Sequence, residues 1–209
     1  EDCLRDYGTT PVRYLDSIGF LGPDVIAAHC VHVDEEEWDI LAERGVSVVH
    51  CPCSNMKLGS GRFPYEMALK YGVSAVHNPS SNMKLGSGFA RITDYLDKEI
   101  NVALGTDGVS SNNNLDLREE MKFAALLAKV AGDPELLPAE QVLDWATRGG
   151  AEALGIDGGV VAEGKLADCL LIDLSNIRMQ PCHSLVSNWV YAADSSCIAN
   201  VICDGKVLK

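Results

Sequence analysis

The sequence feature that most constrains the fold is a segment that occurs twice. It reads VVHCPCSNMKLGSG at 48–61 and AVHNPSSNMKLGSG at 75–88, with His50 and His77 at matching places, 27 residues apart. In both copies a short apolar run ends at a proline and leads into a segment rich in Gly, Ser and Asn, which predicts a strand followed by a loop. Two copies are fewer than the three that a solenoid needs. We therefore interpret residues 46–88 as a duplicated β-loop-α unit inside a globular domain.

The chain around this repeat alternates between two kinds of segment. Short apolar runs predict strands at 24–30, 46–52, 73–79 and 101–108. Amphipathic stretches between and after them predict helices at 34–45, 64–72, 90–100 and 115–132. Strand–helix–strand alternation is typical of a parallel sheet covered by helices, so the fold class is α/β.

Local signals fix several of the expected helix ends. Asp34 with Glu37 three residues later has the pattern of a capping box, and Gly45 is placed to end that helix. Pro64 suits the first helical position of the next helix, and Gly72 lies past its end. Two apolar stripes mark the buried faces of the later helices, at Ile92, Leu96 and Ile100 and at Leu117, Met121, Ala124, Ala125 and Ala128.

The pattern changes near residue 156. Apolar runs at 165–174, 184–193 and 198–208 predict strands with no helices between them. Asp204-Gly205 is a strong signal for a two-residue hairpin turn. We expect two parts: an α/β part over 1–155 and a small β segment over 156–209.

Composition narrows the class of protein. The net charge of −13, from 17 basic and 30 acidic residues, disfavours nucleic acid and anionic lipid as partners. No apolar run approaches the roughly 20 residues of a membrane span, and the first residues do not resemble a secretory signal. None of the 8 cysteines forms a C-x-x-C pair, and several lie in apolar runs, which indicates free thiols. We expect a cytoplasmic protein.

Polar residues at the ends of the expected strands are the candidates for chemistry. In parallel α/β folds ligands bind at the carboxyl ends of the strands, where His29, His50, His77 and Asp107 fall. A histidine there can be a metal ligand or a base, but a single one is more often a satisfied, half-buried residue. Asp107 in LGTDG can also be a plain turn residue. Several such residues at consecutive strand ends favour an enzyme site made of His and Asp, with or without a metal.

Taken together, four segments resemble the amidohydrolase superfamily: AAHCVH (27–32), VHNPSSNMKLGSG (76–88), LGTDG followed by SSNNNLDLREEM (104–121), and GKLADCLLIDL (164–174). The group that is most similar holds the 5′-methylthioadenosine/S-adenosylhomocysteine deaminases, with chlorohydrolases and guanine deaminases as relatives. The resemblance implies the C-terminal part of a (β/α)₈ TIM barrel, followed by a segment of a β-sandwich.

The same resemblance implies the site residues. It makes Asp107 the catalytic proton shuttle, a substrate contact and a metal ligand, and His29 a catalytic residue that steadies the developing oxyanion. The implied cofactor is zinc, or another divalent metal such as iron, and the implied substrate is a small adenosine-like nucleoside. Zinc in such a site turns bound water into hydroxide near neutral pH. We interpret His32 as a solvent-exposed loop residue and the asparagines at 112–114 as support for the site or as turn residues that cap the next helix.

The chain also departs from the family pattern. The first-strand H-x-H metal pair is absent, and so is the fifth-strand histidine with its H-x-x-E glutamate. Asp107 is therefore the one family ligand that remains, and we do not expect this chain alone to hold zinc. Joining Gly61 to Phe89 would restore a single copy of the repeat. We expect the second copy to take the seventh-strand place and the first to form an extra strand or a displaced loop.

These departures leave three hypotheses open: an adenosine-type deaminase seen as a C-terminal fragment, a non-catalytic remnant, and a guanine or triazine hydrolase. An open, partial barrel would expose unpaired strand edges, so self-association is expected as well.

Overall fold

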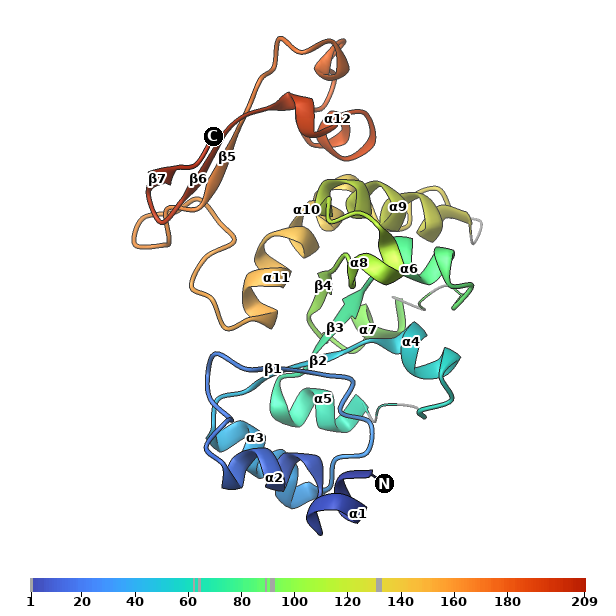
Figure 1. Ribbon diagram of the computed structural model, residues 1–209. Coiled ribbons are helices and arrows are strands. Elements are labelled where there is room, and N and C mark those ends of the chain that lie inside the picture. The colour runs from blue at the N-terminus through green and yellow to red at the C-terminus, as the bar shows by residue number, and fades with distance from the viewer. Residues whose placement is uncertain (1, 62, 64, 89, 91–92, 131–132) are drawn as a thin grey trace.

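The computed structural model describes residues 2–61, 63, 65–88, 90, 93–130 and 133–209. Figure 1 shows α1 (Asp2–Tyr7) and α2 (Pro11–Ser17) beside α3 (Glu35–Glu43) at one end, a parallel sheet in the middle, and an antiparallel sheet at the other end. Along the chain, the helices that connect the two sheets are α8 (Val109–Asn112), α9 (Leu117–Val130), α10 (Ala139–Ala146) and α11 (Arg148–Ala153). The predicted α/β class is confirmed.

The central sheet has four parallel strands in chain order. They are β1 (Ile26–Ala28), β2 (Ser47–His50), β3 (Ser74–His77) and β4 (Val102–Leu104), and each pairs with the next. The two copies of the repeat therefore supply two adjacent strands, β2 beside β1 and β3 beside β4. We expected the additional copy to form either an extra strand or a displaced loop, and the structure shows that it forms the extra strand.

One face of this sheet carries the core. The strand registers place Ala27, Val48, Ala75 and Val102 on the same face, because side chains alternate along each strand. These residues belong to one hydrophobic cluster with side chains of α3, α9 and α10, including Trp38, Met121 and Trp145.

The segment after each repeated strand is a short helix, which corrects the predicted loops. α4 (Pro52–Lys57) follows β2, and α6 (Pro79–Lys84) follows β3. In both copies proline occupies the first turn, where the missing N–H costs nothing. Gly59 and Gly86 follow the two helices with φ of 64° and 61°. The Gly, Ser and Asn content that indicated a loop thus marks only the exit from the helix.

The predicted helix ends are confirmed where they lie within the described residues. Asp34 and Glu37 form the capping box of α3, and Gly45 follows that helix with φ of 69°. Gly72 follows α5 (Tyr65–Tyr71) with φ of 64°. Pro64 and Ile92 lie outside the described residues.

Of the helix expected over 90–100, the described residues contain α7 (Thr93–Leu96), and the chain turns at Glu99, whose φ is 56°. In α9 the predicted apolar stripe packs on the core as expected.

One of the strands predicted for the C-terminal segment is wrong. Strands β5 (Cys169–Ile172), β6 (Ile198–Cys203) and β7 (Lys206–Val207) form an antiparallel sheet, and the Asp204-Gly205 hairpin is confirmed. Residues 184–193, predicted as a strand, instead contain helix α12 (Leu185–Tyr191). The Ser184 hydroxyl caps it by accepting the Ser187 N–H at 3.1 Å, and Val190 is buried in the main core.

Two expectations for this half are not decided by the fold. The pairing of β5 to β7 within a larger β-sandwich stays a prediction, as does the division between 1–155 and 156–209. Within the described residues, no helix has the length and apolar character required to span a membrane.

Candidate functional site

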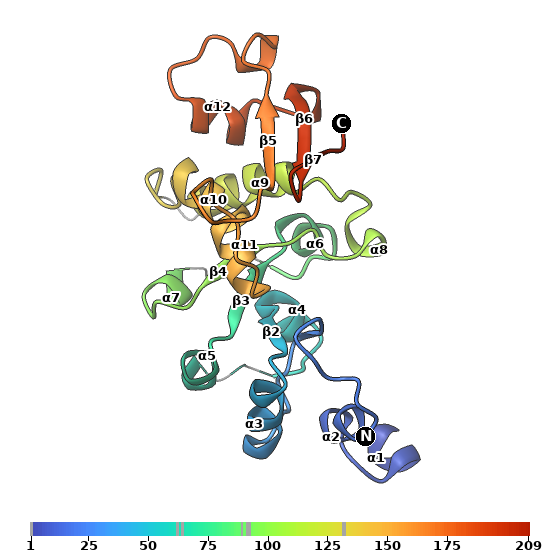
Figure 2. The ribbon, with the colours of Figure 1, turned by 90° about the vertical axis from the view of Figure 1, so that its left-hand side faces the viewer.

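The two catalytic candidates follow the first and last strands of the parallel sheet. His29 comes directly after β1, and Asp107 lies three residues after the end of β4. Because all four strands run the same way, both residues lie at the carboxyl edge. In Figure 2 the short helices α4, α6 and α8 that follow β2, β3 and β4 lie together on one side, opposite α5 and α7. This edge is where parallel sheets bind ligands.

Asp107 is held as a carboxylate by donors on both oxygens. Its φ is 60°, a left-handed conformation that aspartate tolerates through local hydrogen bonds. Ser81 Oγ donates to Oδ2 at 2.6 Å and the Gly108 N–H donates to Oδ1 at 2.7 Å. Partial burial raises the pKa of Asp107, but the hydrogen bonds from Ser81, Gly108 and Ser111 and the charge of His29 outweigh it, so the net pKa is lowered. Asp107 is therefore ionised at neutral pH and can accept a proton.

His29 turns out of the sheet immediately after its strand. Its N–H donates to the Val49 carbonyl at 2.9 Å, which continues the pairing of β1 with β2, and its φ of 75° then redirects the chain. The imidazole is exposed, and its Nδ1 lies 2.6 Å from Asn55 Oδ1 of α4. The other ring nitrogen, Nε2, has no hydrogen bond to a described residue and is available to a ligand.

The two repeated histidines do not join this site. The strand register places His50 and His77 on the core face of the sheet, and each is only 5% exposed. Burial, with the charge of His29, lowers the pKa of His50 to about 4, and burial lowers the pKa of His77 to about 4. Both histidines are therefore neutral core residues. His32 is exposed, as expected for a loop residue.

A buried carboxylate supports the Asp107 loop. Glu120 of α9 is 1% exposed and accepts the Ser80 N–H at 3.0 Å and Asn112 Nδ2 at 2.8 Å. Asn112 Nδ2 also donates to the Thr106 carbonyl at 2.8 Å. Asn113 has a φ of 69° at the end of α8, and Asn114 accepts the Asp116 N–H at 3.2 Å before α9. Of the asparagines at 112–114, the first supports the site and the other two shape the turn into the next helix.

The sequence reasoning missed Asn55, Ser81 and Glu120. A signal for the first two was present, because Ser-Asn recurs at the same distance behind each repeated strand. What the sequence did not reveal is that the two copies use different members of this pair: Asn55 from the first copy contacts His29, and Ser81 from the second contacts Asp107.

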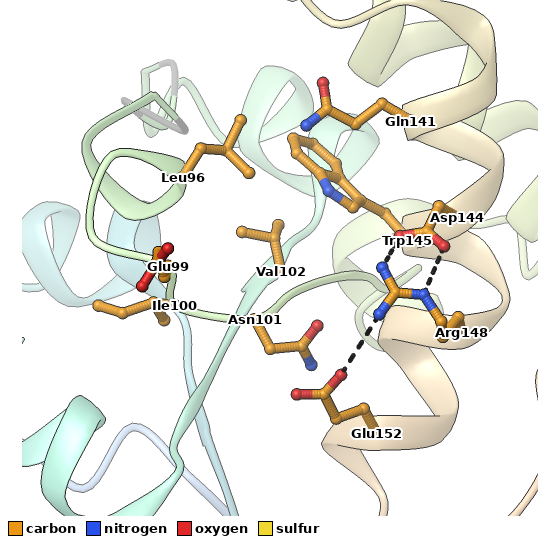
Figure 3. Close-up of a pocket in the computed structure, with 10 residues that line it drawn as sticks. All are labelled: Leu96, Glu99, Ile100, Asn101, Val102, Gln141, Asp144, Trp145, Arg148 and Glu152. Carbon is orange, nitrogen blue, oxygen red and sulfur yellow. Dashed lines mark hydrogen bonds and ion pairs between the residues drawn. The ribbon is translucent and has the colours of Figure 1, made fainter.

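A pocket lies at the opposite edge of the sheet. It is formed where β4 begins, between Asn101 and Val102 on one side and α10 and α11 on the other (Figure 3). The Arg148 guanidinium donates to both Asp144 oxygens, at 2.7 and 2.6 Å, so the cation on its wall is already paired. Because Asp107 lies beyond the other end of β4, this pocket is not part of the candidate site.

The donors at the site do not amount to a metal centre. Within the described ranges, no group of three or more His, Cys, Asp or Glu side chains could hold a metal ion. Asp107 is one oxygen donor, and His29 uses Nδ1 for Asn55. A tetrahedral zinc site needs about three protein ligands, so the donors among the described residues do not by themselves fit zinc.

Comparisons with known proteins agree on one family. The model of the amidohydrolase family matches residues 1–76 and 70–208, two stretches that overlap at 70–76, where the second copy of the repeat begins. The chain is 46% identical over 208 residues to 5-methylthioadenosine/S-adenosylhomocysteine deaminase 1 of Archaeoglobus fulgidus, covering 99% of this chain and 43% of that protein. It is 44% identical over 205 residues to 5'-deoxyadenosine deaminase of Methanothermobacter thermautotrophicus, covering 98% and 42%.

A solved structure gives the same picture. An adenosine deaminase from Xanthomonas campestris with bound zinc matches with a TM-score of 0.61 and 38% identity, over 99% of this chain and 42% of that one. The chain thus spans less than half the length of these relatives.

Proposed function

The chain belongs to the amidohydrolase family, and we propose that it is the part of a hydrolytic deaminase that supplies Asp107 and His29. The proposed substrate is an adenosine-like nucleoside, with S-adenosylhomocysteine and methylthioadenosine as the first candidates. The names of the similar deaminases support this substrate class.

One observation carries the proposal. An ionised aspartate and an exposed histidine lie at the same carboxyl edge of a parallel sheet, and the charge of His29 contributes to lowering the pKa of Asp107. Hydrolytic deamination needs a group that accepts a proton from water and returns it to the amino nitrogen that leaves. A carboxylate held in place by two donors is suited to that task.

The chemistry assigned to this chain is limited to these two residues. Water adds to the ring carbon that bears the amino group, and Asp107 takes a proton from that water. The proton then passes to the amino nitrogen, the C–N bond breaks, and ammonia leaves while the ring carbon keeps the oxygen. His29 directs its free Nε2 to the attacking water and orients it by accepting a hydrogen bond, whereas the oxyanion-steadying role that the resemblance implies would need an N–H at Nε2. Because the donors present do not fit zinc, no step is assigned to a metal.

The two alternatives to this function are the ones that the sequence leaves open. A guanine or triazine hydrolase would use the same edge with another ring, and a non-catalytic remnant would keep the fold without turnover.

The test is ammonia release from methylthioadenosine, S-adenosylhomocysteine, 5′-deoxyadenosine, adenosine, guanine and an aminotriazine. Each substrate is tested with this chain and with the longest polypeptide encoded by the open reading frame that contains it. Both proteins are assayed with and without added zinc. Turnover of the adenosine-type thioethers supports the proposal. Turnover of guanine or the triazine alone would replace the substrate class, and no turnover by either protein would favour the remnant.

A further inference from the structure

A chain of hydrogen bonds runs from the candidate site into the core. His29 Nδ1 lies 2.6 Å from Asn55 Oδ1, Asn55 Nδ2 lies 2.9 Å from His50 Nδ1, and His50 Nε2 lies 3.1 Å from Tyr95 Oη. Asn55 is 1% exposed and Tyr95 6%, so water does not compete for the inner bonds. The exposed His29 is thereby connected by hydrogen bonds to side chains that are buried in the core.

The orientation of the Asn55 amide gives this chain a direction. An amide oxygen only accepts and an amide NH₂ only donates. With the Asn55 oxygen toward His29 and its NH₂ toward His50, His29 donates from Nδ1–H to Oδ1, while His50 accepts at Nδ1 and donates from Nε2–H to Tyr95. His50 is neutral, which is the state that this pattern requires.

We propose that Asn55 is a positioning residue that fixes the tautomer of His29, keeping the proton on Nδ1 and leaving the Nε2 lone pair directed to the substrate. Neutral histidine in water prefers the opposite tautomer, with the proton on Nε2. Without Asn55, most of the neutral His29 would present an N–H donor at the nitrogen that faces the reacting oxygen. The inference deepens the proposed function, on which its catalytic meaning rests.

The second copy of the repeat offers an internal comparison. Asn82 occupies the position that matches Asn55, in the same Ser-Asn-Met-Lys sequence, and is also buried, at 5% exposure. No hydrogen bond joins Asn82 to His29, because β3 is paired with β4 and not with β1. His77, the counterpart of His50, has no partner within the described residues for its buried Nδ1. The positioning role therefore comes from the place of the first copy beside β1 and not from the motif alone.

The experiment reads the tautomer directly. Two-bond ¹H–¹⁵N correlation spectra of the ¹⁵N-labelled 209-residue chain at pH 8 distinguish the protonated ring nitrogen from the bare one, and His29→Gln identifies the His29 signals. In the unaltered chain, His29 is expected mainly as the Nδ1–H tautomer. In Asn55→Leu the proton should move mainly to Nε2, whereas Asn82→Leu should leave His29 unchanged.

Asn55→Asp provides the conservative variant, because the carboxylate still accepts from Nδ1–H and should preserve the tautomer. The unaltered chain tests the inference even if neither Asn55 variant folds. A dominant Nε2–H tautomer of His29 in the unaltered chain would overturn it, and so would an equal response to Asn55→Leu and Asn82→Leu.

Turnover separates this inference from the proposed function. Where the polypeptide encoded by the whole reading frame is active, Asn55→Leu should lower kcat by about 10–100-fold, by analogy with the loss of the hydrogen-bond partner that orients a metal-bound histidine. The expected tautomer together with a lack of deaminase activity would leave the positioning role intact and refute the function.

Discussion

A single added methyl group should have opposite effects at two adjacent glycines of α11. Gly149 packs against the start of β4, and a Cβ built there would approach the Val102 carbonyl oxygen to well under 3.0 Å and Asn101 Oδ1 to 3.3 Å. A Cβ at Gly150 would meet only the Trp145 carbonyl oxygen, at 3.8 Å. Gly149→Ala should therefore destabilise the fold, and Gly150→Ala should stabilise it.

The magnitudes follow from two opposing contributions. Replacing glycine by alanine inside a helix gains about 0.5–1 kcal/mol. Overpacking typically costs about 1–3 kcal/mol, and here the obstacle is a backbone oxygen of a sheet strand that no rotamer change can move. Asn101 Nδ2 also donates to the Gly149 carbonyl at 2.9 Å, and losing this bond would cost about 0.5–1.5 kcal/mol more. We expect Gly149→Ala to lose about 1–3 kcal/mol of unfolding free energy.

Urea denaturation followed by circular dichroism is the assay. With the slope m unchanged, the midpoint should fall for Gly149→Ala and rise slightly for Gly150→Ala. If Gly149→Ala is as stable as Gly150→Ala, the close packing of α11 on β4 is wrong.

Three further outcomes are expected. Ser184→Ala should cost about 1 kcal/mol and weaken amide protection in α12, because the hydroxyl caps that helix; unchanged hydrogen exchange at 185–191 would contradict the cap. The free energy of unfolding should fall as pH is lowered from about 6.5 towards 4, because His50 and His77 have a folded pKa of about 4 and only the unfolded state binds protons in this range. The loss should reach up to about 1.4 kcal/mol per pH unit for each histidine. Urea midpoints that stay level over this range would argue against neutral core histidines. The purified chain should self-associate, because β1 is an edge strand and Ile26 on it is 56% exposed; a monodisperse monomer in sedimentation velocity would count against this.

The parallel direction of the strands could be predicted because short apolar runs alternate with amphipathic segments. Capping at Asp34 and the hairpin at Asp204-Gly205 were also readable, since each depends on residues close in sequence. Helix α12 was not, because its run of apolar and β-branched residues fits a buried strand equally well. Its state is decided by the Ser184 cap and by packing of Val190 into the main core.

The candidate site was predictable only in part for a related reason. His29 and Asp107 stand at strand ends, where the sequence pattern points to chemistry. The role of Asn55 depends on the first copy forming a strand beside β1, and the sequence left open whether that copy is an extra strand or a displaced loop. Glu120 was hidden because an acidic residue in a helix is usually solvated, whereas here it is buried and accepts two hydrogen bonds.

The central claim is that Asp107 moves the proton in hydrolytic deamination. The most direct test is ammonia release from methylthioadenosine by the reading-frame product carrying Asp107→Asn, with Asp34→Asn on the loop after His29 as control. Asparagine keeps the shape but cannot accept a proton, so kcat should fall by about 10²–10⁴-fold, while the control should keep its rate. Near-normal turnover by Asp107→Asn would contradict the account.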